Sequence, residues 1–346
     1  MRFASFPARL TVAAVAATGL LVVPATGASA SSAKAAAQCA WNIQTLEAPA
    51  HLSGYQIKAA DGNYVVGNGE DEDWNQSPVL WHGGRATVLE TPDGASGSVI
   101  DVNARGQVVG RISGVGPVLW SGGEVIELAV PEGADSVIPS AINDSGLIVG
   151  NVSESADDEW ITRGIAWSAD SPGEYQDLGA GQGTLRLADV NDAGTIVADT
   201  SKTNGEGHTT ALRGTLADGF EPIPVDDDVV AGNVSQVAGE YTLGTTWAPV
   251  DDYIEMYETL WQGDASTRIT PSFFSKAVNA DGLVAGRVGN QGAVWTSGAS
   301  ITLPTLAPGV RTDPTAVTDE GTVLGVAVTQ PDVEGQGRVP VIWTCA

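Results

Sequence analysis

The stretch Val102-Asn103-Ala104-Arg105-Gly106-Gln107-Val108-Val109-Gly110 decides the fold, because the chain repeats its pattern. An apolar residue precedes Asn-x-x-Gly, and a short apolar run then ends in a second glycine. A strand ending in Trp120 follows, then the turn Ser121-Gly122-Gly123 and a last strand ending in Leu128. Asn-x-x-Gly suits a hairpin turn that ends in the left-handed region, which glycine tolerates. Each unit therefore predicts four short antiparallel strands joined by tight turns.

Seven copies of this unit follow one another along the chain. A repeat of about 40–50 residues with four strands is typical of a β-propeller blade. Trp ends the third strand in six copies, and one blade cannot bury so large a side chain alone, so we expect it to pack against a neighbouring blade. The sequence predicts an all-β, seven-bladed β-propeller with four antiparallel strands per blade. The second glycine of the unit, or the residue in its place, is Gly67, Gly110, Gly150, Ala198, Gly244, Gly286 and Gly325 in the seven copies.

The last repeat lacks a fourth strand, because the chain ends at Trp343-Thr344-Cys345-Ala346. Residues 43–49 read like residues 86–92, the fourth strand of the first repeat. We therefore expect the N-terminal strand to complete the last blade. Cys39 and Cys345, the two cysteines of the chain, would then meet where other blades have a covalent turn, and we expect a disulfide between them. Closing so long a loop is worth about 4–5 kcal/mol in the chain-entropy model.

The first thirty residues have the form of a secretory signal peptide. Arg2 and Arg9 precede an apolar stretch over residues 10–23, and Ala28-Ser29-Ala30 matches a signal peptidase site. Cleavage after Ala30 would leave a short segment, 31–38, and a single propeller domain, 39–346. No later segment has the length of apolar sequence that a membrane-spanning helix needs. We therefore expect a secreted, extracellular monomer.

The charge balance limits the classes of partner. The chain carries 42 Asp and Glu residues against 16 Lys and Arg residues, a formal net charge of −26. Such a surface repels phosphate backbones and anionic headgroups, so nucleic acid is not an expected partner. Its simplest role is solubility. The charge is compatible with a cationic ligand.

The loops that join the second and third strands vary in length, whereas the turns of the opposite rim are short. Binding residues usually lie on variable loops over a rigid scaffold. Three of these loops combine acids with an aromatic side chain, at Asp71-Glu72-Asp73-Trp74, Asp157-Asp158-Glu159-Trp160 and Asp251-Asp252-Tyr253. The candidate ligand-binding residues are Trp74, Trp160, Tyr253, Asp71, Asp73, Asp158 and Asp252.

Three interpretations of these loops are open. The aromatic rings would stack on a carbohydrate, cationic or protein ligand while the acids supply charge. Alternatively the acids would hold Ca²⁺, although Asp71 and Asp73 are the nearest approach to the spaced carboxylates of a calcium loop. The simplest interpretation treats the loops as solvated segments without a ligand, whose aromatic side chains pack against the blade.

No catalytic or metal-binding motif is recognisable. A Gly-x-Ser-x-Gly elbow, zinc-type histidine spacing and a phosphate-binding Gly-Lys-Ser/Thr are all missing from the sequence. The nearest approach to an acid–base pair is His208 beside Glu206. We therefore assign no catalytic residue, metal or cofactor, and favour a secreted, non-enzymatic binding propeller of undefined ligand. The alternatives are an extracellular hydrolase or lyase that uses acids of the variable loops, and an envelope-associated scaffold.

The unit resembles the HAF-type extracellular repeat of bacterial secreted proteins, whose core reads Ile-Asn-x-x-Gly-x-Val-Val-Gly before an x-Leu-Trp strand. The resemblance covers residues 41–346 and implies an extracellular repeat protein of propeller type. The chain departs from the His-Ala-Phe that gives the family its name, reading Pro78-Val79-Leu80-Trp81 and Gly292-Ala293-Val294-Trp295 at matching positions. The resemblance carries no catalytic residue over to this chain.

Overall fold

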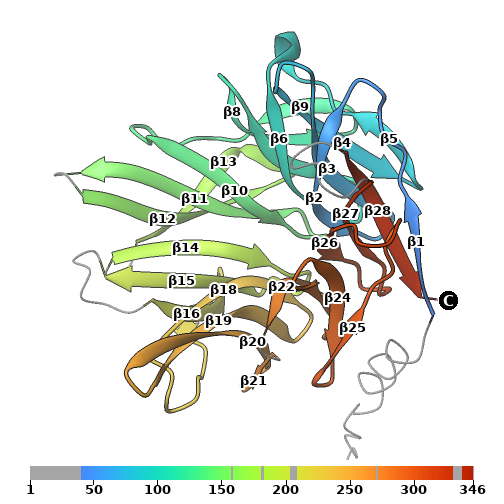
Figure 1. The fold of residues 1–346 in the computed structure, drawn as a ribbon. Coiled ribbons are helices and arrows are strands. Elements are labelled where there is room, and N and C mark those ends of the chain that lie inside the picture. The colour runs from blue at the N-terminus through green and yellow to red at the C-terminus, as the bar shows by residue number, and fades with distance from the viewer. Residues whose placement is uncertain are drawn as a thin grey trace, which may run out of the picture.

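The computed structural model describes residues 40–156, 159–180, 183–202, 209–269, 272–329 and 337–345. In this part of the chain the strands form seven antiparallel sheets of four strands each. Figure 1 shows the sheets radiating from a common centre as blades. The predicted seven-bladed β-propeller is therefore confirmed. Within the described residues, no helix is both long and apolar enough to cross a membrane.

The blades follow one another in chain order, and in blades one to six the innermost strand comes first. Blades one to three contain β2 (Ser53–Asp61), β3 (Tyr64–Glu70), β4 (Gln76–His82), β5 (Arg85–Val88), β6 (Gly97–Val102), β7 (Val108–Ile112), β8 (Gly116–Ser121), β9 (Glu124–Glu127), β10 (Ser136–Ile142), β11 (Leu147–Ala156), β12 (Glu159–Ser168) and β13 (Ser171–Gly179), with a 3₁₀ turn, η1 (Pro92–Gly94), between the first two. Blades four to six contain β14 (Gly183–Val190), β15 (Ile196–Lys202), β16 (Thr210–Thr215), β17 (Gly219–Pro222), β18 (Ala231–Ala238), β19 (Tyr241–Val250), β20 (Tyr253–Gln262), β21 (Ala265–Arg268), β22 (Phe273–Val278), β23 (Val284–Val288), β24 (Gln291–Thr296) and β25 (Ala299–Thr302).

The seventh blade joins the two ends of the chain. It contains β26 (Thr312–Val317), β27 (Val323–Val328), β28 (Arg338–Cys345) and, as its outermost strand, β1 (Trp41–Thr45). Figure 1 shows β1 alongside β28 near the C-terminus, and Trp41 is paired with Cys345. The prediction that the N-terminal strand completes the last blade is confirmed. Cys39 lies outside the described residues, so its bridge to Cys345 stays a prediction.

The recurring Trp packs between blades, as the repeat predicts. Trp81, Trp261 and Trp343 are fully buried. Their indoles also donate hydrogen bonds to backbone carbonyls just after a neighbouring fourth strand, as Trp343 Nε1 does to Pro304 O over 2.8 Å. The position therefore needs both a large apolar area and an N–H donor, and Trp supplies both.

Glycine suits the two positions of the repeat for different physical reasons. Gly106 closes the Asn-x-x-Gly turn with a φ of +72°, in the left-handed region, as predicted. Gly110 has an ordinary backbone conformation, but a Cβ there would lie 2.2 Å from the carbonyl oxygen of Ser98 on the innermost strand. The innermost strand has a β-bulge beside this position, between Val99 and Asp101. Close backbone approach thus favours glycine at this second position, and blade four is the exception with Ala198.

Candidate functional site

The propeller has two distinct faces. On one, here called the hairpin face, the second and third strands of each blade are joined, as at residues 71–75 and 251–252. On the other, called the turn face, the innermost strand turns tightly into the second, as at residues 103–107. The sequence placed the candidate residues on the hairpin face. The structure shows candidate features on both.

The three predicted aromatic residues are strongly exposed. Trp74 is 72% exposed in the loop after β3, Trp160 is 65% exposed on β12, and Tyr253 is 77% exposed at the start of β20. They belong to blades one, three and five, so an intervening blade separates each from the next. Among the described residues no ring stacking links them. The described ring contacts therefore do not link the three side chains to one another.

The predicted acids have different surroundings. Asp71 accepts hydrogen bonds from the backbone N–H groups of Asn75 and Asp73, at 2.8 and 2.9 Å, and from the Asn75 side chain. These bonds, those from Asn75 first, hold the pKa of Asp71 below its ordinary value. Asp73 and Asp252 are exposed, and Asp158 lies outside the described residues. Within the described part of the chain, no three His, Cys, Asp or Glu residues are grouped as a metal site requires.

Blade five carries a long hairpin on this face. β19 and β20 pair over their whole length, from Tyr241 opposite Gln262 to Val250 opposite Tyr253. The outermost strand, β21, covers β20 only from Thr259 onward. The outer half of β20 therefore has an edge without a strand partner. Four apolar side chains of this half-hairpin are exposed, Val250 by 38%, Tyr253 by 77%, Ile254 by 61% and Met256 by 55%.

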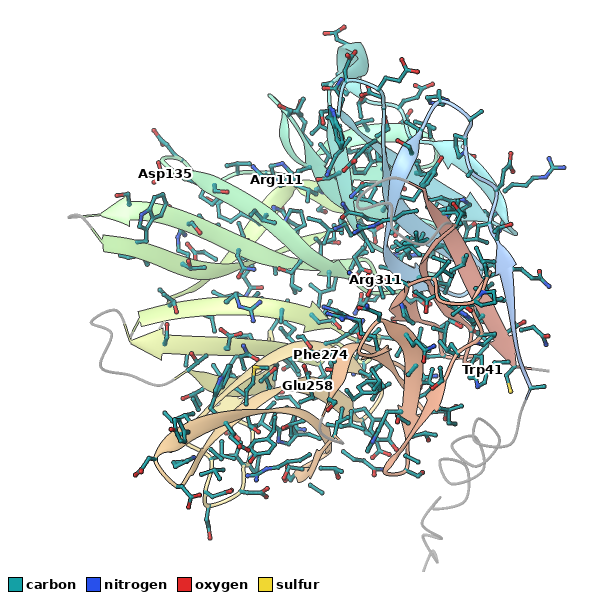
Figure 2. All side chains as sticks on the ribbon, viewed as in Figure 1. Trp41, Arg111, Asp135, Glu258, Phe274 and Arg311 are labelled. Carbon is teal, nitrogen blue, oxygen red and sulfur yellow. The ribbon has the colours of Figure 1, made fainter. Side chains whose placement is uncertain are left out.

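A groove of about 300 Å³ separates this hairpin from blade six. Figure 2 shows Glu258 of β20 close to Phe274 of β22, and the two line the groove together. Glu258 accepts a hydrogen bond from the Ser275 hydroxyl, while burial raises its pKa above the ordinary value. Phe274 is 43% exposed. The other residues of the groove are Glu255, Met256, Tyr257, Ile269, Ser272 and Phe273.

The turn face holds a second feature, an axial cavity of about 220 Å³. Innermost strands and tight turns of most blades line it, with no Lys, Arg or His among the lining residues. We call it the acidic cavity, because five aspartates line it: Asp61, Asp101, Asp189, Asp192 and Asp319.

Two of these aspartates occupy equivalent positions, just after the bulges of β6 and β14. Asp101 accepts the backbone N–H of Ile142, and Asp189 accepts that of Val237, each over 2.8 Å and each from the next blade. Gln236 does the same in blade five, accepting from Val278 over 2.7 Å. The position therefore joins neighbouring blades, and it also turns a polar side chain toward the axis.

Three acids of the cavity have raised pKa values. Burial raises the pKa of Asp101 to about 6 and that of Asp189 well above its ordinary value. Burial, followed by repulsion from Asp144, Asp192 and Asp101, raises the pKa of Asp61 to about 7. Repulsion of this kind means that the negative charge of the cavity is not compensated by a neighbouring cation.

No motif of the sequence singles out these acids as a group, although a local signal is present. Residues 101–103 and 189–191 both read Asp-Val-Asn, directly before the turn. Among the histidines, His82 stacks on Tyr64 with ring centroids 4.3 Å apart, which gives it a packing role at a turn. His208 and Glu206 lie outside the described residues, so the structure does not test them as an acid–base pair.

The fold defines the class of protein, a seven-bladed β-propeller. The chain is similar to the β-propeller domain of the Trilobed protease from Pyrococcus furiosus, with 11% identity and a TM-score of 0.56 over 86% of this chain and 94% of that chain. It is also similar to a puromycin-hydrolyzing peptidase from Mycobacterium tuberculosis, with 14% identity and a TM-score of 0.55 over 93% of this chain and 53% of that chain.

A further similarity is to YCF48 bound to D1 peptide, with 11% identity and a TM-score of 0.50 over 88% of this chain and 95% of that chain. At these identities the likeness shows the fold alone, because one propeller fold hosts many functions. No protein-family model matches the sequence. No curated protein matches it either.

Proposed function

We propose that this chain is a secreted, non-enzymatic binding propeller that takes up an extended segment of a partner polypeptide on the hairpin face. The observation that carries the proposal is the outer half of β20, which combines an edge free of β21 with exposed Tyr253, Ile254 and Met256. A long, apolar edge strand is a template for pairing with another chain. Added strands bind through backbone hydrogen bonds, and side-chain pockets provide specificity.

The charges around β20 indicate the kind of segment. Exposed Asp251, Asp252 and Glu255 surround the apolar residues of the hairpin, and the whole chain has a formal charge of −26. Opposite charge steers association and selects the partner. The matching segment therefore alternates apolar residues, for the groove beside Phe274, with Lys or Arg.

The surroundings of the groove favour a preformed site. The Arg268 guanidinium lies 4.3 Å from the centre of the Tyr257 ring and pairs with Asp228. Tyr257 donates a hydrogen bond of 2.7 Å to Glu255. A surface held by such contacts needs little ordering when a ligand binds, so less binding free energy is lost to conformational entropy.

Secretion belongs to the same proposal and rests on the pattern of the first thirty residues. The HAF-type character of the repeat rests on the motif of residues 102–110, and the bridge between Cys39 and Cys345 on the chemistry of exported proteins. The second candidate function, an extracellular hydrolase or lyase, would need acids of the hairpin face to act together.

The test is selection from a displayed library of random peptides. We expect the wild-type protein to enrich sequences that alternate apolar and basic residues, and the double variant Ile254→Ser/Met256→Ser to lose that enrichment. Tyr175→Ser is the matched control, since Tyr175 is 42% exposed on the outermost strand of blade three. Enrichment that the double variant retains in full would overturn the proposal. Cleavage of enriched peptides during incubation would favour the hydrolase instead.

A further inference from the structure

We propose that the hairpin face binds a neutral oligosaccharide at the junction of blades one and two, where a polar groove lies beside the loop that carries the exposed indole of Trp74. The groove belongs to a different pair of blades from the β20 edge, so this inference goes beyond the function proposed above and does not depend on it. Three observations support it: the uncharged lining of the groove, the open backbone within it and the strained, rigid loop of Trp74.

Three loops of the hairpin face meet around this groove, which has a volume of about 510 Å³. Ser96, which precedes β6, links the other two loops. Its hydroxyl accepts the backbone N–H of Gln76 over 3.1 Å and donates to the carbonyl of the same residue over 3.3 Å. Its own carbonyl accepts the backbone N–H of Ser113 over 2.9 Å. These hydrogen bonds hold the loops of blades one and two together, so the groove between them is preformed.

Uncharged polar groups line the groove. No Asp or Glu is among its described lining residues, although the chain contains 42. Arg111 is the one charged residue there, and it precedes Ile112, whose side chain packs in the core between blades one and two. Because successive side chains of a strand point to opposite faces, the Arg111 side chain points away from that core, toward blade three. Among the described residues, neither the Gln76 amide nor the Ser113 hydroxyl has a hydrogen-bond partner, so both can bind a ligand.

Two glycines of the loop between β7 and β8 leave the groove open. Gly114 and Gly116 line it and have φ angles of +77° and +117°, a region that glycine tolerates best. A Cβ at either position would meet no atom within 4 Å, so the space above their backbone is free. A ligand in the groove can therefore approach bare peptide groups as well as the polar side chains.

Trp74 is held in a backbone conformation that its side chain disfavours. Its φ is +66°, which for a bulky residue is an outlier. The Asp71 carboxylate fixes the loop by accepting the N–H groups of Asp73 and Asn75 over 2.9 and 2.8 Å, and Trp74 N donates to Asp71 O over 3.1 Å. Glycine or asparagine would fit this φ with less strain, and packing gains little from an indole that is 72% exposed. Backbone outliers of this kind cluster at ligand-binding positions.

The groove and the indole together match an oligosaccharide. Trp74 does not line the groove, but its Cα lies within about 7 Å of that of Gln76, which does, because two residues span no more. A chain of two or more sugar rings can therefore contact both. A sugar ring has an apolar face of C–H groups that packs on an indole, and hydroxyls that both donate and accept, as serine and glutamine side chains do. A nucleic-acid strand also stacks on indoles, but the charge of −26 repels its phosphates.

The uncharged lining gives the binding a signature. Glu72 and Asp73 precede Trp74 and are exposed, so a cationic ligand at the indole would lose affinity as salt screens those acids. A neutral sugar held by hydroxyls and one ring does not depend on that attraction. Its affinity should therefore be independent of ionic strength.

The test begins with native gel electrophoresis of the protein through gels that contain hydroxyethyl cellulose, soluble starch or galactomannan, with polygalacturonate as the charged comparison. We expect at least one neutral polymer to retard the wild-type protein. Isothermal titration with oligosaccharides of that polymer should then give dissociation constants within about twofold of each other at about 0.02 and 0.5 M NaCl. Retardation by no neutral polymer, or affinity at least about tenfold weaker at the higher salt concentration, would overturn the proposal.

Variants separate a ligand-binding indole from a structural one. Trp74→Asn removes the ring and suits the left-handed backbone, so it should weaken sugar binding at least about tenfold and melt at the wild-type temperature or higher. Trp74→Tyr keeps a ring and should retain most of the affinity. Gln76→Ala tests the groove alone and should weaken binding about threefold or more. The matched control is Tyr175→Ser, which removes an exposed ring from blade three and should leave sugar binding unchanged.

The variants also keep this site distinct from the β20 edge. Ile254→Ser/Met256→Ser should bind the sugar as the wild type does, so failure of one site leaves the other standing. Equal losses in Tyr175→Ser, unchanged binding in both Trp74→Asn and Gln76→Ala, or a lower melting temperature of Trp74→Asn would overturn the proposal. Peptide enrichment that Trp74→Asn abolishes, without sugar binding by the wild type, would assign the indole to a polypeptide partner and overturn it as well.

Discussion

The side-chain amide of Asn103 donates a hydrogen bond of 3.0 Å to the backbone carbonyl of Asn143 in the next blade. Its carbonyl oxygen meanwhile accepts the N–H groups of Arg105 and Gln107, 3.1 and 3.0 Å away, inside its own turn. One buried asparagine thus shapes a turn and joins two blades. Asn143 repeats the contact toward Asn191, over 2.8 Å. The same repeated asparagine therefore forms the turn and links neighbouring blades.

Replacing Asn103 with alanine should destabilise the propeller. The change leaves a buried carbonyl and two turn N–H groups without this partner, and we expect a loss of about 2–3 kcal/mol in the free energy of unfolding. Urea denaturation at neutral pH measures it. Asn63→Ala, in the exposed two-residue turn of blade one, is the control and should cost less than about 1 kcal/mol. Equal losses of unfolding free energy in the two variants would contradict the role of Asn103 in linking neighbouring blades.

Thr318→Asn should stabilise the protein. Asn191 donates to the carbonyl of Gly239 over 2.9 Å, in a two-residue turn like the one at Gly62 in blade one. An asparagine at 318 would make the corresponding bond to blade one, worth about 1 kcal/mol. Thermal melting without ligand measures the gain. A lower melting temperature would mean that the contact between blades seven and one differs from the contacts between the other blades.

The acids of the cavity predict the direction of a pH effect. The pKa of Asp61 rises from an ordinary 3.8 to about 7 in the folded protein, so the fold favours its protonated form. Its contribution to stability is complete below about pH 4 and is lost as pH rises through 7. Asp61→Asn should therefore gain stability relative to wild type between pH 4 and pH 8, by on the order of 1 kcal/mol after discounting for solvent screening.

Melting curves of the two proteins over this range test that prediction. Asp93→Asn, an exposed acid of η1, gives the baseline for removing one negative charge from an acidic protein. A difference between Asp61→Asn and wild type that does not change with pH would contradict the raised pKa.

Reduction of the predicted disulfide between Cys39 and Cys345 should weaken the seventh blade, which closes the ring. Trp41 is paired with Cys345 on the strands that join the chain ends, and Cys39 precedes Trp41 by two residues. We expect a bridge between the cysteines to add up to about 4–5 kcal/mol. Mass spectrometry of the non-reduced protein, before and after alkylation, measures whether the thiols are linked. Two alkylated thiols in the non-reduced protein would exclude the bridge.

Much of the fold was predictable because its signals are local. The turn glycine at 106 repeats in each blade, whereas the glycine at 110 and the Trp at 120 each repeat in six, with Ala198 in place of the glycine and no Trp in blade four. The sequence also placed Trp74, Trp160 and Tyr253 in loops between the second and third strands, whereas the structure has Trp160 on β12 and Tyr253 at the start of β20, with all three side chains exposed. The acidic cavity was not foreseen, because its aspartates look like ordinary turn residues when each repeat is read alone.

The sequence by itself determined the number of blades, the order of the strands and the use of the N-terminal strand to complete the seventh blade, since each of these depends on a local pattern that recurs along the chain. Only the tertiary structure decided which side chains meet. Asp61, Asp101 and Asp189 stand about one blade or more apart in the chain, and closure of the ring brings them to one axis. It is their shared burial and mutual repulsion, properties of the assembled ring, that turn them into a candidate site.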